Sequence, residues 1–179
     1  FSIIRQHEGA IEVESKQGKG TTFRVYLPAE NPIPEEGSTK ETVKHKGEGK
    51  ILVMDDEAII VNLLRDTLAL AGYTAVCAAS ADEAMDLFER ETQSGETFAA
   101  AILDLTIPGS RGGIDVANAL RAEAPSLPIF ISSGYADSPA MSAPESYGFT
   151  ACIEKPFSVA DIMNILSRHL PPRNKEHDP

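Results

Sequence analysis

The stretch ILVMDDE, residues 51–57, decides the fold, because a continuous apolar run ends there in three adjacent acids. Apolar character without alternation is typical of a strand that is covered on both faces of a sheet. Two later runs have a similar form. AAAIL, residues 99–103, is followed by Asp104, and FTACI, residues 149–153, is followed by EKPF, residues 154–157.

Strand patterns and helix patterns alternate five times after residue 50, which predicts an α/β fold: a doubly wound five-stranded parallel sheet with right-handed crossovers. The expected strands cover residues 51–54, 74–78, 99–103, 128–132 and 149–153. The expected helices cover residues 58–71, the segment after Ser80, residues 114–122 and residues 159–170, with apolar residues at helical spacing. In the first of them these residues are Ile59, Leu63, Leu64, Leu68 and Leu70.

Two helical segments carry more specific expectations. Ser80 and Glu83 have the spacing of a capping box at the start of a helix. Pro144 removes a backbone N–H from the interior of the fourth helical segment. We therefore expect a short or broken helix between Ser138 and Tyr147.

Composition excludes several classes of protein. The formal charge of −11 argues against sequence-independent nucleic-acid binding, which needs clustered Lys and Arg. No apolar run approaches the roughly 20 residues of a membrane helix, and no signal-peptide pattern opens the chain. Cys77 and Cys152 lie in strand-like runs without metal or disulfide spacing, so we expect buried free thiols and a cytoplasmic protein. The missing initiator Met indicates a piece of a longer protein.

A polar segment rich in Pro and Gly separates two patterned parts of the chain. Residues 30–49 lack apolar periodicity and are predicted to be a linker. Residues 1–29 hold two strand patterns around a glycine turn, which predicts a β-hairpin. Residues 50–170 form the α/β domain, and residues 171–179 are a polar tail that we expect to be flexible.

Polar side chains that follow the parallel strands should meet, because the carboxyl ends of such strands line one crevice. Asp55, Asp56 and Asp104 would bring three carboxylates together near Lys155. Without a cation these carboxylates would repel one another and titrate as a coupled set. Mg²⁺ favours a few carboxylate ligands together with phosphate oxygens. The residues therefore predict a magnesium and phosphoryl site.

Residues from about 50 to 170 resemble the receiver domain of two-component signalling. The resemblance implies the flavodoxin-like strand order 2-1-3-4-5. Its landmarks stand in the family's order: Asp55 and Asp56 after the first strand, Asp104 after the third within DLTIPG, Ser133 and Gly134 after the fourth, and KPF, residues 155–157, after the fifth.

The resemblance also assigns the metal ligands and the phosphorylated residue. Asp104 would be the nucleophile that accepts the phosphoryl group. Mg²⁺ would be bound directly by Asp56, by Asp104 and by the backbone carbonyl of Thr106, while Asp55 would hold a metal-bound water.

Two more residues of the family pattern would position the phosphoryl group. Lys155, with a cis bond to Pro156, would place a point charge on a phosphoryl oxygen. Ser133 would donate its hydroxyl to another oxygen and act as a switch, because its movement reports phosphorylation. Cys152 departs from the pattern, since the family has an aromatic switch residue at this position. Tyr135 is a candidate to shield the phosphoryl group instead.

The hairpin segment resembles the end of a histidine-kinase ATP-binding domain, through GKGTTFRVYLP, residues 18–28. The nucleotide-binding motifs of that family and its phospho-accepting histidine are missing from this chain, so its own enzyme activity stays uncertain. The order of kinase end, linker and receiver is that of a hybrid sensor histidine kinase, with a membrane anchor upstream left open. A phosphohistidine on a kinase or phosphotransfer domain would be the partner, and a homodimer is left open. No output domain is expected to follow.

Two other functions remain open at this point. A degenerate receiver would bind metal through the same carboxylates and serve as a docking module without phosphorylation. A small hydrolase would use Asp104 as a transient nucleophile, but that class generally has a second aspartate two residues later, where this chain has Thr106. The complete set of acids with Ser133 and Lys155 favours a phospho-accepting receiver.

Overall fold

The computed structural model describes residue 4 and residues 8–28, 45–108, 111–134 and 138–172. The chain divides into two compact units, Phe1–Thr39 and Lys40–Pro179. Among the residues described, no helix combines the length and the apolar character needed to cross a membrane. Most of the predicted linker, most of the predicted tail, and Tyr135 lie outside the described residues.

The first unit contains the predicted hairpin, an antiparallel pair formed by β1 (Ala10–Lys16) and β2 (Gly20–Tyr26). Val13 lies directly opposite Phe23, and the two side chains are 60% and 66% exposed. Directly opposed residues of an antiparallel pair share one face of the ribbon. The hairpin therefore carries apolar side chains that its own two strands leave exposed.

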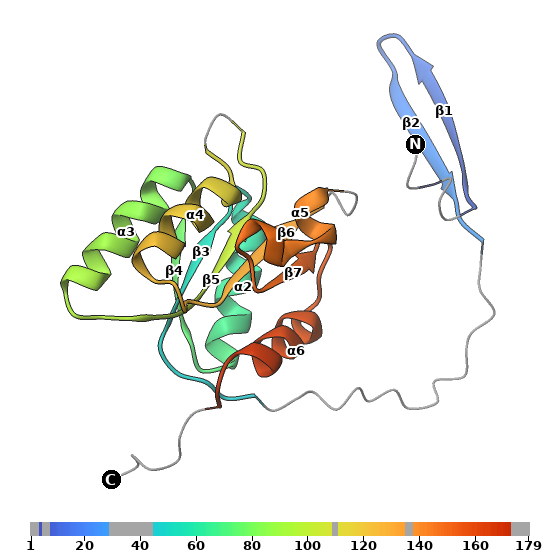
Figure 1. Cartoon of the computed structure of the whole chain (residues 1–179). Helices are drawn as coiled ribbons and strands as arrows, with labels where there is room; N and C mark the ends of the chain where they lie inside the picture. Colours follow the sequence, from blue (N-terminus) through green and yellow to red (C-terminus); the bar gives the residue numbers. More distant parts are fainter. Residues whose placement is uncertain (1–3, 5–7, 29–44, 109–110, 135–137, 173–179) are drawn as a thin grey trace, which may run out of the picture. The chain divides into compact units, whose positions relative to one another are not determined.

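The second unit contains a five-stranded parallel sheet in the order β4-β3-β5-β6-β7 (Figure 1). Counted from β3, this is the order 2-1-3-4-5, so the predicted fold class is confirmed. The bounds are β3 (Lys50–Met54), β4 (Thr74–Ala78), β5 (Phe98–Asp104), β6 (Ile129–Ser133) and β7 (Ala151–Glu154).

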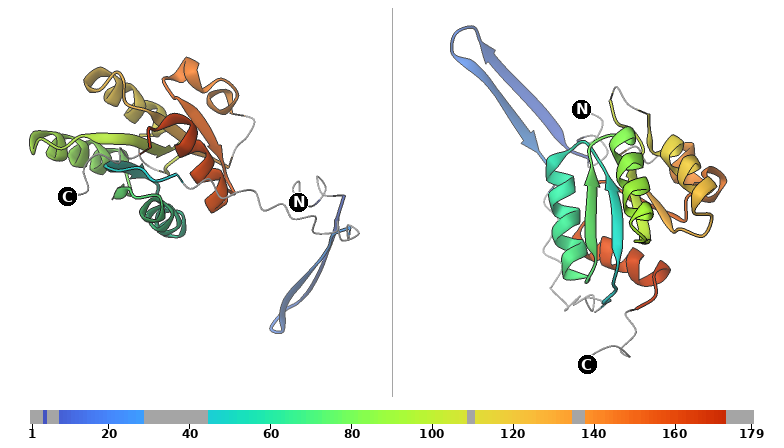
Figure 2. Two further views of the ribbon diagram at one scale, coloured as in Figure 1. Left: turned by 90° about the horizontal axis from the view of Figure 1, so that it is seen from below. Right: turned by 90° about the vertical axis from the view of Figure 1, so that its left-hand side faces the viewer.

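Helices cover both faces of this sheet (Figure 2). Alternate side chains of a strand point to opposite faces, so each strand contributes to two apolar clusters. Ile102 packs in the cluster that holds α2 (Ala58–Leu70) and α6 (Val159–His169). Leu103 packs in the cluster that holds α3 (Ala81–Gln93) and α4 (Gly113–Glu123). We call these two sides the α2/α6 face and the α3/α4 face.

The apolar residues of α2 do not form one buried stripe. Leu64 and Leu68 are buried, as predicted, whereas Ile59 is 81% and Leu70 is 71% exposed. Each residue turns the helix by about 100°, so Ile59 lies about 140° around the axis from Leu64. Helical spacing therefore predicted the helix, but it did not predict burial of Ile59 and Leu70.

The N-terminus of α3 is capped by the two residues that the spacing indicated. The Ser80 side chain accepts a hydrogen bond from the backbone N–H of Glu83 at 3.3 Å. The Glu83 carboxylate accepts a hydrogen bond from the backbone N–H of Ala79 at 2.8 Å. A capping box requires this donor to be the N–H of Ser80, one residue later. The helix start is confirmed, and the return bond is shifted by one residue.

The segment between β6 and β7 is the broken helix that Pro144 predicts. It consists of α5 (Pro139–Ser142) and the 3₁₀ turn η1 (Pro144–Tyr147). Arg121 of α4 holds the following turn, because its guanidinium donates to the carbonyl oxygen of Gly148 at 2.9 Å.

The two cysteines are free thiols, as predicted, but they are not both buried. Cys77 is half-buried, whereas Cys152 is exposed. Cys152 is paired with Ile131, whose side chain lies on the α3/α4 face. Because β7 is an edge strand and only the short α5 and η1 precede it, this side of β7 has little cover. The expectation of a buried Cys152 was wrong.

Residues before β3 pack onto the second unit, although they belong to the predicted linker. His45 is 6% exposed, and its Nε2 lies 2.9 Å from Oη of Tyr73. The N–H of Gly47 donates to the carbonyl of Ala71 at 2.8 Å. The packed part of the domain therefore begins at His45, five residues before the first residue of β3, Lys50.

Candidate functional site

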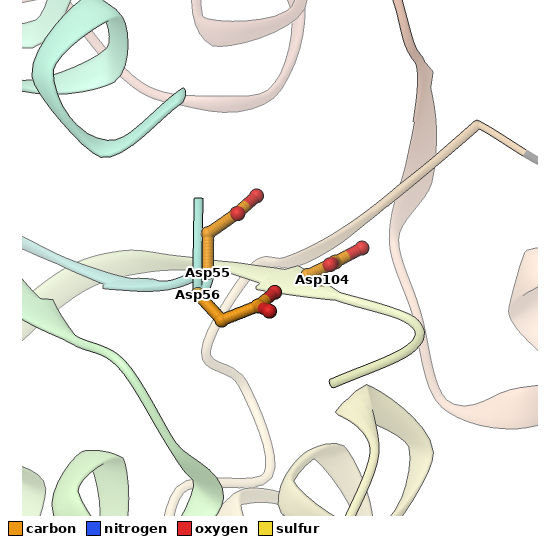
Figure 3. Close-up of side chains that lie close together, drawn as sticks. All are labelled: Asp55, Asp56 and Asp104. Carbon is orange, nitrogen blue, oxygen red and sulfur yellow. The ribbon is translucent and has the colours of Figure 1, made fainter. Parts of the chain in front are cut away.

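Three carboxylates meet at the carboxyl end of the sheet (Figure 3). Asp55 and Asp56 follow β3, and Asp104 is the last residue of β5, the strand next to β3. One carboxylate oxygen of each lies within 4.8 Å of those of the other two. Asp55 and Asp104 are buried, at 1% and 7% exposure, whereas Asp56 is exposed.

Lys155 follows β7, on the other side of β6, and contacts two of these carboxylates. Its Nζ donates a hydrogen bond to Oδ2 of Asp55 at 2.7 Å and lies 3.5 Å from Oδ2 of Asp104. Its backbone N–H donates to the carbonyl oxygen of Ser133 at 2.8 Å. The peptide bond from Lys155 to Pro156 is cis, as the resemblance implies. The ammonium is thus held between two buried acids.

An open pocket of about 590 Å³ lies above these groups. Thr106 and Ser133 both line it. Among the described residues, every predicted site residue except Asp55 and Cys152 therefore lines one space. The lining consists of Asp56, Glu57, Ile60, Asp104, Thr106, Pro108, Ser133, Gly134, Lys155 and Pro156.

Burial is the main influence on the charge of Asp104. Loss of water raises the pKa of this carboxyl above its ordinary value; the charge of Lys155 opposes the rise, and the charge of Asp55 adds to it. Burial lowers the pKa of Lys155, but the hydrogen bond to Asp55 and the nearby carboxylates more than offset this, so the pKa is raised. The site favours a charged lysine beside a carboxylate that is costly to ionise.

The donor set fits a hard divalent cation. Three carboxylate oxygens within 4.8 Å of one another are the ligand type that Mg²⁺ prefers, with room for water and phosphate oxygens in the open pocket. A cation there would relieve the cost of ionising Asp104, which one lysine does not remove.

The predicted switch residues lie apart. Ser133 is 2% exposed and lines the pocket, whereas Cys152 lies in β7, where its side chain is exposed. Six predicted site residues thus lie together at the carboxyl end of the sheet: Asp55, Asp56, Asp104, Thr106, Ser133 and Lys155. Cys152 does not line this site.

Two residues near the site were not singled out by the sequence. The Glu57 carboxylate lies 3.6 Å from Nζ of Lys155, and its adjacency to the acid pair was an available signal. Ser132 is 1% exposed, and its hydroxyl has no hydrogen-bond partner among the described residues. A polar residue within an otherwise apolar strand was the signal for Ser132.

Solved structures share this architecture. Chemotaxis protein CheY4 of Vibrio cholerae is 26% identical, with a TM-score of 0.60, over 69% of this chain and 100% of that chain. Response regulator protein TrrA of Thermotoga maritima, solved in complex with Mg(2+)-BeF, is 26% identical, with a TM-score of 0.57, over 68% of this chain and 99% of that chain.

Two curated sensor proteins match nearly all of the chain. Sensor kinase CckA of Brucella abortus is 28% identical over 95% of this chain, and sensor protein EvgS of Escherichia coli is 27% identical over 94%. The chain spans only 18% of the length of CckA and 14% of that of EvgS. The family model of the response regulator receiver domain matches residues 51–167, well over half of the chain. The chain therefore belongs to the response regulator receiver domain family.

Proposed function

We propose that this chain accepts a phosphoryl group on Asp104 from a phosphohistidine of a kinase or phosphotransfer domain. The observation that carries the proposal is the placement of the Asp104 carboxylate in an open pocket, with the Lys155 ammonium 3.5 Å away. A carboxylate nucleophile, a fixed cation and space for an incoming group are the main requirements of phosphoryl transfer.

In the transfer step, an oxygen of Asp104 forms a bond to phosphorus while the phosphorus–nitrogen bond of the phosphohistidine breaks. The electron pair of the broken bond stays on the imidazole nitrogen. Lys155 would move from Asp55 toward the phosphoryl oxygens and neutralise their charge. Ser133, which lines the pocket, would donate its hydroxyl to another phosphoryl oxygen and report its presence by moving.

The metal in this proposal is Mg²⁺, bound directly by Asp56, by Asp104 and by the carbonyl of Thr106, with Asp55 acting through a water. When bound, Mg²⁺ supplies positive charge for the phosphoryl oxygens. Asp56 and Asp104 line the pocket, and Asp55 lies beneath Lys155 with its Oδ1 accepting the N–H of Glu57 at 2.9 Å. Asp55 is the one acid of the three that does not line this pocket, which supports its assignment to a metal-bound water.

Incubation with acetyl phosphate and Mg²⁺, followed by intact-mass measurement, tests the proposal. Wild type should gain one phosphoryl group. Asp104→Asn should gain none, and Asp86→Asn on the exposed side of α3 should behave as wild type. Metal binding without any adduct would contradict phosphorylation and leave the docking module as the function.

We also propose that the parent protein is a hybrid histidine kinase, in which residues 1–29 end the ATP-binding domain, residues 30–49 link it to the receiver of residues 50–170, and residues 171–179 form a tail. The matches to two sensor proteins, which cover 95% and 94% of this chain, support this order. In the hairpin, Ile11 opposes Val25 and Val13 opposes Phe23. This apolar face of the ribbon suits packing against a larger domain, because an isolated hairpin is marginally stable.

A substitution in that face separates the two contexts. Phe23→Ser should leave the melting temperature of the receiver unit in this chain unchanged. In the longer parent protein it should lower the melting temperature of the ATP-binding domain and reduce autophosphorylation. Wild-type behaviour of Phe23→Ser in the parent would contradict the assignment of the hairpin to that domain.

A further inference from the structure

The hydroxyl of Ser132 is a buried polar group without a hydrogen-bond partner among the residues that the structure describes. Its residue is 1% exposed. Leaving such a group unpaired is costly, and native proteins rarely do so without a reason. An alanine would fill this position of β6 without that penalty, so the hydroxyl needs an explanation.

The sheet register places this hydroxyl beside the phosphoryl-accepting carboxylate. Ser132 is the direct partner of Asp104 across β5 and β6, and of Ile153 across β6 and β7. Ile153 belongs to the apolar cluster of the α2/α6 face. Paired residues of neighbouring strands point to the same face, so Ser132 and Asp104 extend to this face together.

Lys155 passes over the same position. It follows β7, and its Nζ contacts Asp104 in β5 and Asp55 after β3. Since β6 lies between β7 and β5, the lysine side chain must cross the end of β6 to reach these acids. Ser132 is thus next to the carboxylate that loses a cationic partner whenever the lysine moves away.

We propose that Ser132 is a positioning residue for phosphoryl transfer, whose hydroxyl donates a hydrogen bond to the Asp104 carboxylate when Lys155 turns to the phosphoryl group. This inference rests on the proposed function. A serine side chain has three staggered rotamers, so a rotation about one bond would redirect the hydroxyl toward its neighbour. The bond would hold the oxygen of Asp104 that does not attack phosphorus.

Two substitutions of equal shape isolate the hydroxyl. Ser132→Thr keeps it, and Ser132→Val replaces it by a methyl group. With acetyl phosphate and Mg²⁺, Ser132→Thr should be phosphorylated within about twofold of the wild-type rate, whereas Ser132→Val should be about tenfold slower, as expected for one lost hydrogen bond to a charged group. Ser142→Ala, at an exposed serine of α5, serves as the control.

A binding measurement separates this role from a structural one. Without metal, Ser132→Val should melt no lower than Ser132→Thr, because it lacks the unpaired hydroxyl. The rise in melting temperature on adding Mg²⁺ and beryllium fluoride should be smaller for Ser132→Val than for Ser132→Thr. Equal rates and equal rises for these two variants would overturn the inference and leave the proposed function intact. A wild-type protein that forms no adduct would instead contradict the proposed function.

Discussion

The two ends of the parallel sheet differ in how they satisfy buried polar groups. At the amino end, the buried ring of His45 has a hydrogen-bond partner in Tyr73, at 2.9 Å. At the carboxyl end, burial holds the pKa of Asp104 above its ordinary value, and the hydroxyl of Ser132 has no partner among the described residues. The amino end is arranged for stability, and the carboxyl end keeps polar groups at a cost in stability.

This difference indicates where a ligand acts. Buried polar groups that are incompletely paired destabilise a fold, and proteins keep them mainly at functional sites. A divalent cation would offset the unfavourable negative charge near Asp104, whereas the His45 ring already has its hydrogen-bond partner. Substitutions at one end of the sheet at a time test this difference.

The largest effect is expected from Lys155→Ala. It removes the ammonium between Asp55 and Asp104 and leaves two buried carboxylates without their cation. The free energy of unfolding without metal should fall by about 3 kcal/mol, the usual cost of breaking a buried ion pair. Mg²⁺ should still bind and restore part of the loss, while phosphorylation of Asp104 slows. Urea unfolding with and without Mg²⁺ measures the first effect, and intact mass measures the second.

Lys46→Ala is the matched control for Lys155, because Lys46 is exposed. It should change the free energy of unfolding by no more than a few tenths of a kcal/mol, typical of an exposed site. If Lys155→Ala were as stable and as active as wild type, our role for this lysine would be wrong.

At the amino end, Tyr73→Phe should lower the free energy of unfolding by about 1–2 kcal/mol, because it leaves the buried Nε2 of His45 without its partner. His45→Ala should then cost less in the Tyr73→Phe background than in wild type. A double-mutant cycle by urea unfolding measures this coupling. Phosphorylation rates of folded protein should not change, and additive effects of the two substitutions would contradict the pairing.

Asp104→Asn should act in the opposite direction and stabilise the metal-free protein. A carboxyl whose pKa is raised in the folded state costs stability as the pH rises through that pKa, and the cost vanishes below its ordinary value of 3.8. At pH 7 the variant should have a higher free energy of unfolding than metal-free wild type, seen as a higher melting temperature. The difference in stability between the variant and wild type should disappear near pH 3. It should also shrink in the presence of Mg²⁺, because the cation stabilises the ionised Asp104 of wild type. A lower melting temperature at pH 7 would refute it.

The smallest effect concerns the pH dependence of His45. Burial lowers the pKa of this imidazole below 6.5, so its contribution to stability is complete above pH 6.5 and is lost as the pH falls through the lowered value. Between pH 7.5 and 5.5, the free energy of unfolding of wild type should fall relative to that of His45→Gln. Parallel stability profiles for the two proteins would show that burial of His45 has no such effect.

Much of the fold and most of the candidate site were predictable from the sequence. The apolar runs before Asp55 and Asp104 identified strands that are covered on both faces of a sheet, because such strands lack alternation. Strand–helix alternation then predicted the parallel sheet, and a parallel sheet brings its carboxyl ends to one edge. Pro144 predicted the broken helix by removing a backbone donor.

Other features depend on neighbours that are distant in sequence. The exposure of Cys152 follows from an edge strand with little cover, and periodicity carries no information on which strand lies at an edge. The buried His45 lies in a polar segment and is fixed by Tyr73 across the chain. Ile59 matched a helical spacing, but only the side chains on the side of the helix that faces the core become buried.

By itself, the sequence determined that carboxylates and a lysine would gather at the carboxyl end of one sheet. A parallel sheet brings the carboxyl ends of its strands together, and alternation along a strand decides to which face each side chain points. Only the tertiary structure decided how these groups share charge: Lys155 is bonded to Asp55, Asp104 is buried enough to resist ionisation, and Ser132 is left beside it without a partner. Burial and distances between strands set these energies, and both arise from packing of the whole domain.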